Sequence, residues 1–204
     1  MKKLLMLLLC LALTPAWAES IPAKLAKEVM ARQDWASELE KCPADLFSPP
    51  GQQKYNGEVR ALCEDPATQS ECMTNCTSGK GEYCYWLATG LQKTVSNTNE
   101  GSEILFQRAC KLGIASGCTN RAATMMPDPP LTVNSNSCPG RSFERTCAAN
   151  DPWGCTMHGL ILSEDKSIPR NKERALEALK KACQFDKRDP ACISANALKK
   201  KLQP

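Results

Sequence analysis

The sequence predicts an all-α protein built from repeated helical hairpins that disulfides hold together. Three observations indicate this fold class. Four cysteine pairs enclose seven, seven, seven and eight residues, and their first cysteines lie 34, 37 and 36 residues apart. A fixed period of this length is typical of stacked helix pairs, and amphipathic helix patterns lead into the cysteines. The pairs are Cys76/Cys84, Cys110/Cys118, Cys147/Cys155 and Cys183/Cys192.

Residues 1–18 are expected to be a secretory signal peptide and not part of the fold. Two lysines precede a leucine-rich run, and Ala16 and Ala18 supply the small residues of a cleavage site before Glu19. The apolar run is shorter than the ~18 residues that a membrane anchor needs. A lipoprotein modified at Cys10 is the alternative, but Leu9 is not the small residue that such a site prefers.

Cysteine count and charge indicate the compartment and limit the partners. Cleavage would remove one of 13 cysteines and leave an even set of 12, which in an exported chain implies disulfides. The lysine–leucine start is typical of bacteria, so we expect a periplasmic or secreted protein. The mature chain would have 204 − 18 = 186 residues and a charge of 24 − 22 = +2. We therefore expect no nucleic-acid partner and no stable membrane insertion after cleavage.

Residues 19–71 are predicted to form an N-terminal region that precedes the regular repeats. A helix is expected over residues 23–41, followed by a loop over 43–57 that contains two consecutive prolines and two glycines. Cys63 and Cys72 then enclose eight residues and resemble a degenerate fifth pair. Cys76 follows one helical turn after Cys72, so exchanged pairing among these three cysteines stays open.

The regular repeats are predicted over residues 72–204. The helix before each first cysteine carries a bulky apolar residue one turn earlier, except in the first block, where Cys72 stands there. These bulky residues are Phe106, Phe143 and Leu179.

A polar turn and a second helix follow each first cysteine. Asp151 and Asp189 each precede a proline, which is typical of a helix start. Small residues stand four positions after three of the second cysteines and allow close helix packing; they are Ala88, Ala122 and Gly159.

Disulfides explain the cysteine spacing better than zinc. Structural zinc sites favour two to four residues between paired cysteines, and the chain has one histidine. Each short bridge closes a small loop and is worth about 2–3 kcal/mol in the chain-entropy model. By elimination, Cys42 is expected to pair with Cys138. We expect neither a metal nor another cofactor.

Residues 126–140 are predicted to be an insertion between the two helices of one repeat, because they contain Pro127, Pro129, Pro130 and an Asn-Ser-Asn sequence. Long loops in compact domains are often functional, but a tolerated surface insertion is an equal alternative. A bridge from Cys42 to Cys138 would tether this loop and the 43–57 loop on one side.

The block over residues 107–118 resembles the cysteine-rich branch of the Sel-one-like repeat family, which is related to tetratricopeptide repeats. The resemblance covers residues 72–202 and is weak in the N-terminal quarter. It implies a right-handed αα-hairpin solenoid in which a Cys-x7-Cys pair bridges consecutive helices. It also implies protein–protein contact through a concave face. Some relatives are described as binding or slowly cleaving penicillin-type substrates, and some look like immunity proteins against phospholipase toxins.

Catalytic residues are not indicated. His158 follows Cys155 by three positions, and the other repeats have no histidine there, so we expect a structural residue on a helix surface or partly buried. Ser163 and Lys166 match the Ser-x-x-Lys sequence of penicillin-binding enzymes. They are expected in an exposed hairpin turn, and the companion sequences are absent.

We therefore predict a non-enzymatic, periplasmic or secreted scaffold that binds another protein through its concave face. The first alternative is a periplasmic immunity or inhibitor protein against a secreted, phospholipase-type toxin. The second is a weak penicillin-binding or β-lactam-hydrolysing protein. Candidate contact residues are aromatic or long side chains, which could equally belong to the core; they are Tyr83, Tyr85, Trp86, Arg121, Trp153 and His158.

Overall fold

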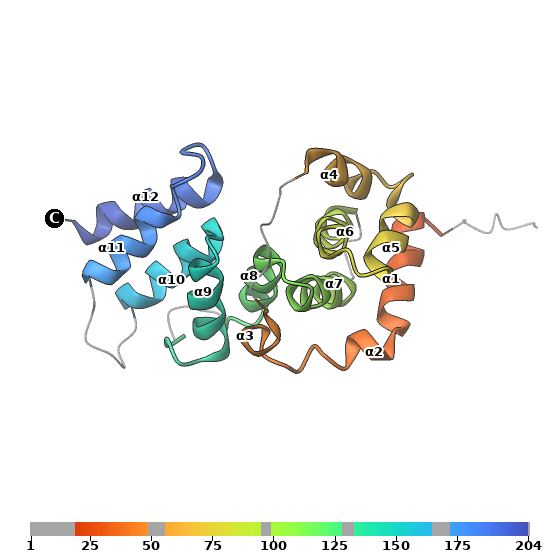
Figure 1. Cartoon of the computed structure of the whole chain (residues 1–204), viewed down its shortest axis with the longest axis horizontal. Helices are drawn as coiled ribbons and strands as arrows, with labels where there is room; N and C mark the ends of the chain where they lie inside the picture. Colours follow the sequence, from red (N-terminus) through yellow and green to blue (C-terminus); the bar gives the residue numbers. More distant parts are fainter. Residues whose placement is uncertain (1–18, 49–55, 95–98, 128–132, 165–171, 204) are drawn as a thin grey trace, which may run out of the picture.

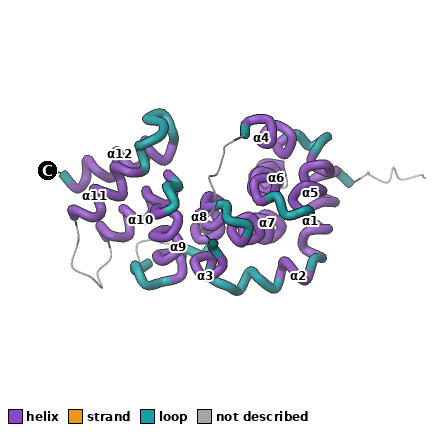
Figure 2. Tube along the Cα trace, in the orientation of Figure 1, coloured by secondary structure: helices purple, strands orange, loops and turns teal. Residues whose placement is uncertain are grey.

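The computed structural model describes residues 19–48, 56–94, 99–127, 133–164 and 172–203, and this described part is all-helical, without a strand (Figure 2). The predicted signal peptide lies outside it. The helices are α1 (Ile21–Ala31), α2 (Gln33–Ala36), α3 (Pro43–Leu46), α4 (Gly57–Glu64), α5 (Gln69–Thr77), α6 (Gly81–Thr94), α7 (Asn99–Lys111), α8 (Ala115–Thr124), α9 (Cys138–Ala148), α10 (Pro152–Glu164), α11 (Lys172–Lys181) and α12 (Pro190–Leu202). Those from α5 to α11 progress along the long axis of the molecule, whereas α1 to α3 run beside α5 to α8 (Figure 1).

The predicted cysteine pairs join the end of one helix to the start of the next. From α4 onward, each helix contacts the next one along the chain. This includes α8 and α9, which pack directly against each other although a longer loop separates them in sequence. The short bridges have Cα–Cα distances between 4.2 and 5.3 Å, near the lower end of the roughly 4.4–6.8 Å usual for disulfides. They are Cys63–Cys72, Cys76–Cys84, Cys110–Cys118, Cys147–Cys155 and Cys183–Cys192. Cys76 pairs with Cys84, so the exchanged pairing is not the one in the structure.

The turn inside each bridged loop also repeats. Gly79, Gly113 and Asn150 each stand three positions after a first cysteine, and each has a positive φ, of 91°, 87° and 68°. Glycine and asparagine tolerate this left-handed conformation best, and it is the usual way to end a helix. The repeat is therefore encoded in the backbone of the turn as well as in the cysteines.

The core includes the bulky residues that the repeat pattern singled out. The side chains of Phe106, Phe143 and Leu179 are fully buried. A β-carbon on Gly159 would lie 2.6 Å from Leu179 Cγ, closer than carbon atoms can approach. The small residue at this position is thus required by the packing of α10 on α11.

The helix starts agree with the predicted Asp-Pro signals. Asp189 accepts a hydrogen bond from the Ala191 amide at 2.7 Å and caps α12. Asp151 accepts one from the Gly154 amide at 2.7 Å, at the start of α10. These aspartates satisfy amides that the first turn of a helix leaves without partners.

The single helix expected over residues 23–41 was wrong. The chain leaves helical geometry at Arg32, with φ −79° and ψ 89°, and only the short helix α2 follows. This bend lets Trp35 bury its ring, which is 3% exposed, between the guanidinium groups of Arg32 and Arg108. Burial of a large aromatic surface outweighs the few helical hydrogen bonds that are lost.

The loop expected over residues 43–57 contains the short helix α3, which begins at Pro43, where a proline suits the first helical position. Residues 49–55 of this loop lie outside the described residues. So do residues 128–132 of the insertion between α8 and α9.

Candidate binding surface along helices α7, α9 and α11

Residues 32–48, here called the N-terminal strap, run beside the helix array from α1 to α9 (Figure 1). Helix α2 contacts α7, and α3 contacts α7, α8 and α9. The strap therefore crosses three successive helices of the array but has no contact of this kind with α10, α11 or α12 in the described part of the chain.

Side-chain donors of the array hold the main-chain carbonyls of the strap. Gln107 Nε2 donates to the carbonyl oxygens of Glu38 and Lys41, at 2.7 and 2.9 Å. Arg121 Nη2 donates to the carbonyl of Leu39 at 3.0 Å. Because the acceptors of these bonds are main-chain carbonyls, the bonds fix the path of the strap without depending on its side chains.

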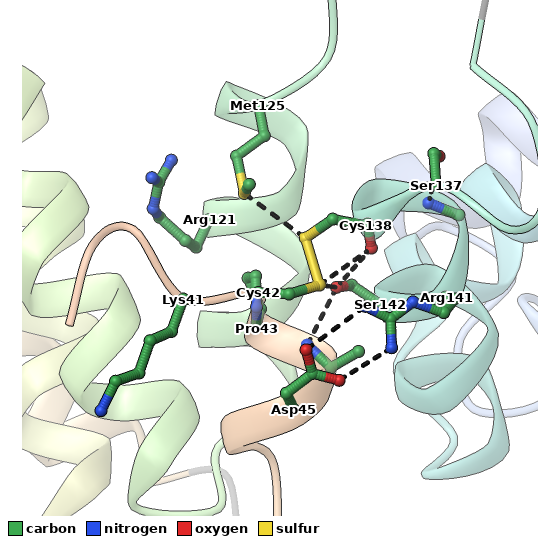
Figure 3. Close-up of a disulfide and its surroundings, with 12 residues drawn as sticks. Lys41, Cys42, Pro43, Asp45, Arg121, Met125, Ser137, Cys138, Arg141 and Ser142 are labelled. Atoms are coloured by element: carbon green, nitrogen blue, oxygen red, sulfur yellow. Dashed lines mark hydrogen bonds and ion pairs between the residues drawn. A yellow bond between two sulfur atoms is a disulfide. The ribbon is translucent and has the colours of Figure 1, made fainter.

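The strap is anchored most firmly on α9. The disulfide between Cys42 and Cys138 joins residues 96 apart in sequence, with a Cα–Cα distance of 5.6 Å. The Ala44 amide donates to Ser142 Oγ at 3.1 Å, and Arg141 pairs with the exposed Asp45 at 2.8 Å (Figure 3). The covalent link that elimination predicted is thus surrounded by polar contacts between the same two segments.

A basic side chain meets an aromatic ring of the strap at the same position of two repeats. Arg108 and Arg145 both stand two residues before a first cysteine. The guanidinium of Arg108 lies 5.2 Å from the ring of Trp35, and that of Arg145 lies 5.9 Å from the ring of Phe47. Arg145 also donates to the carbonyls of Ala44 and, at 2.9 Å, of Phe47.

Two adjoining pockets lie at the Phe47 end of the strap. The first has a volume of about 220 Å³ and is lined by Phe47, Arg145, Ala148 and Ala149. The second, also of about 220 Å³ and open to solvent, shares Ala148 with the first and lies between α9, α10 and α11. It is here called the His158 pocket, and it is lined by Glu144, Cys147, Ala148, His158, Leu162, Arg174, Glu177, Ala178 and Lys181.

His158 is a buried titratable group in this pocket, and its pKa is displaced. The residue is 9% exposed, and its Nδ1 is buried without a hydrogen-bond partner among the described residues. Burial lowers the pKa of His158; Glu144 opposes this shift and Arg174 adds to it. The imidazole is therefore neutral at neutral pH and keeps one unsatisfied polar atom.

The shifted histidine predicts how stability depends on pH. The unfolded chain binds a proton at His158 near pH 6.5, whereas the folded chain binds it only at lower pH. The contribution of neutral His158 to the free energy of unfolding is therefore fully present above pH ~6.5, and it is lost as the pH falls through the pKa of the folded state. Replacing His158→Gln should remove this part of the pH dependence, measured by urea unfolding between about pH 7.5 and about pH 5. Identical pH profiles for both proteins would contradict the assignment.

The six candidate contact residues do not form one exposed surface. Trp86, Arg121 and His158 are each at most 9% exposed. Tyr83 and Tyr85 are partly buried and pack against the core. Trp153 differs, because its ring is 41% exposed at the start of α10.

The binding residues of the strap and the pocket were missed, apart from Arg121, His158 and the Cys42–Cys138 bridge. One sequence signal could have found them. A basic residue stands two positions before the first cysteine in three repeats, at Arg108, Arg145 and Lys181.

The described residues give no catalytic arrangement for Ser163. The expected hairpin turn was wrong for Ser163, because this residue lies in the last turn of α10. It is 6% exposed, and its Oγ donates to the Leu160 carbonyl at 2.7 Å. Lys166 lies outside the described residues. Within the described ranges no three His, Cys, Asp or Glu side chains gather in a way that could hold a metal ion.

Comparison with known proteins identifies no relative: no family model, no curated protein and no solved structure matches the chain. None of the described helices is long and apolar enough to cross a membrane. The six disulfides indicate an oxidising environment, such as the periplasm or the cell exterior.

Proposed function

We propose that this protein is an exported, non-enzymatic scaffold, a disulfide-stapled αα-hairpin solenoid of the Sel-one-like type that binds another protein. The observation that carries the proposal is the surface along α7, α9 and α11. One part of this surface already binds a segment from outside the repeats, the strap, and the adjoining part is an open pocket.

Three features suit this surface to a protein partner. The strap contacts include main-chain hydrogen bonds and aromatic anchors, which are the usual elements of peptide recognition. The pocket beyond it is smaller than the roughly 300–1,000 Å³ of sites for drug-sized molecules. The staples hold successive helices in a fixed relation, which lowers the entropy that binding would cost.

Capture of the partner tests the proposal. Oxidised protein would be immobilised and exposed to the periplasmic and secreted fractions of the bacterium that makes it, and captured proteins would be identified by mass spectrometry. The affinity of a captured partner would then be measured for Lys181→Glu, which changes a charge in the pocket, and for Lys180→Glu, which makes the same change on an exposed neighbour outside the pocket lining.

We expect Lys181→Glu to weaken binding at least tenfold and Lys180→Glu to change it less than about twofold, in line with the concentration of binding energy in few residues. A partner that both variants bind equally would remove this surface from the proposal. Failure of the wild-type protein to capture any protein from either fraction would contradict the function itself.

A further inference from the structure

The strap shows what the array binds at two of three equivalent positions. Trp35 lies on Arg108, and Phe47, twelve residues later, lies on Arg145. At each position a basic side chain two residues before a first cysteine faces an aromatic ring. The third such position is Lys181, on α11.

The third position carries no ring from the described part of the chain. Lys181 Nζ donates to the Ala148 carbonyl at 3.3 Å and lines the His158 pocket. Ala148 also lines the first pocket, beside Phe47, so the two pockets adjoin. A chain that followed these adjoining pockets away from Phe47 would enter the His158 pocket next.

The chemistry of the pocket favours an uncharged side chain with a polar end. Its charges balance, because Arg174 and Lys181 stand against Glu144 and Glu177. Apolar atoms of Leu162 and Ala178 contribute to its lining. The imidazole of His158 is part of the lining, and its Nδ1, although enclosed by protein atoms, has no partner among the described residues. A hydroxyl group can donate to or accept from a ring nitrogen, whichever tautomer is present.

We propose that the His158 pocket takes a tyrosine side chain from an extended segment of a partner protein. The ring lies between Lys181 and the apolar lining, and the phenol hydroxyl pairs with the imidazole of His158. Tyrosine is among the residues most enriched at the energetic centres of interfaces, because its ring buries a large area and its hydroxyl finds a partner. The inference rests on the proposed function and specifies the partner's contact residue.

Two pentapeptides test the inference on the full, oxidised chain. One peptide has capped termini and copies residues 44–48 of the strap, which include Phe47. The other peptide is identical except that tyrosine replaces the phenylalanine. Titration of the isotopically labelled protein, followed by amide NMR shifts, gives an affinity and a location for each peptide. We expect saturable shifts on α9, α10 and α11, with the tyrosine peptide bound about two- to tenfold more tightly, the size of one net hydrogen bond.

The variant His158→Phe keeps a ring in the pocket but removes its nitrogens, so it should abolish the preference for tyrosine. Trp153→Ala, on the same helix but outside the pocket lining, should leave that preference unchanged. Because the readout is a ratio of two affinities on one protein, a variant with lower stability still gives a valid answer. Equal affinities for the two peptides on the wild-type protein, shifts confined to other helices, or no saturable shift would each overturn the inference.

This test and the capture experiment fail separately. The titration needs no natural partner, so a negative capture result does not decide it. Conversely, a captured partner that binds the Lys181→Glu variant as well as the wild-type protein keeps the binding function and removes this pocket as the contact.

Discussion

Replacing both Cys42 and Cys138 with alanine should lower the free energy of unfolding by about 4 kcal/mol. Their bridge closes a loop of 96 residues, whereas the other five bridges close loops of 8 or 9. In the chain-entropy model a longer loop restricts the unfolded chain more, so this bridge should contribute more than any other. Urea unfolding followed by circular dichroism measures the difference.

The matched control is replacement of Cys110 and Cys118 with alanine, which opens one short loop and should cost about 2–3 kcal/mol. Hydrogen exchange adds a local readout, because loss of the long bridge should expose strap amides such as that of Ala44, which donates to Ser142. A long bridge that costs no more than the short one, with unchanged exchange in the strap, would contradict its assigned role.

Replacing Asp151→Ala should lower the free energy of unfolding by about 3 kcal/mol. The carboxylate lies in the interior and accepts hydrogen bonds from the Gly154 amide at 2.7 Å, Thr119 Oγ1 at 2.8 Å and Ser116 Oγ at 2.6 Å. Alanine would leave an uncapped α10 and unpaired hydroxyl groups on α8. Chemical unfolding of the purified variant measures the loss.

Asp189→Ala is the matched control for this prediction. Asp189 occupies the same Asp-Pro position in the last repeat but lies partly exposed, and among the described residues its carboxylate accepts a hydrogen bond from the Ala191 amide alone. Its loss should cost about 1 kcal/mol, the usual value for a helix cap. Equal effects of the two substitutions would mean that the link between α8 and Asp151 contributes nothing.

The periodic part of the fold was predictable because the same physical requirement recurs every 34 to 37 residues. Every repeat has two cysteines, and most add one large buried residue such as Phe143 and one small residue such as Gly159, where no β-carbon fits beside Leu179. Such requirements leave a pattern in one sequence without any comparison. The left-handed turn residues, Gly113 among them, belong to the same pattern.

The strap was not predictable in the same way, because its contacts occur once and join distant residues. Nothing in the local sequence around Arg32 shows that the helix must end there so that Trp35 can pack against Arg108, 73 residues later. Cys42 and Cys138 were paired only by elimination. The exposure of Trp153 and the burial of Arg121 likewise depend on which helix covers them.

The candidate site depends both on the repeated sequence pattern and on contacts that only the tertiary structure shows. Repetition explains why a basic residue recurs at Arg108, Arg145 and Lys181. Only the tertiary structure shows that the first two face rings of the strap and that the third lines a pocket with His158. The proposed binding function therefore depends on the strap being held where the structure places it.

Mass mapping of peptides from the unreduced protein tests this covalent framework most directly. The account predicts one peptide pair that links Cys42 to Cys138 and five short-range pairs. The short-range pairs are Cys63–Cys72, Cys76–Cys84, Cys110–Cys118, Cys147–Cys155 and Cys183–Cys192. Free thiols at these positions, or Cys42 linked to any residue other than Cys138, would contradict it.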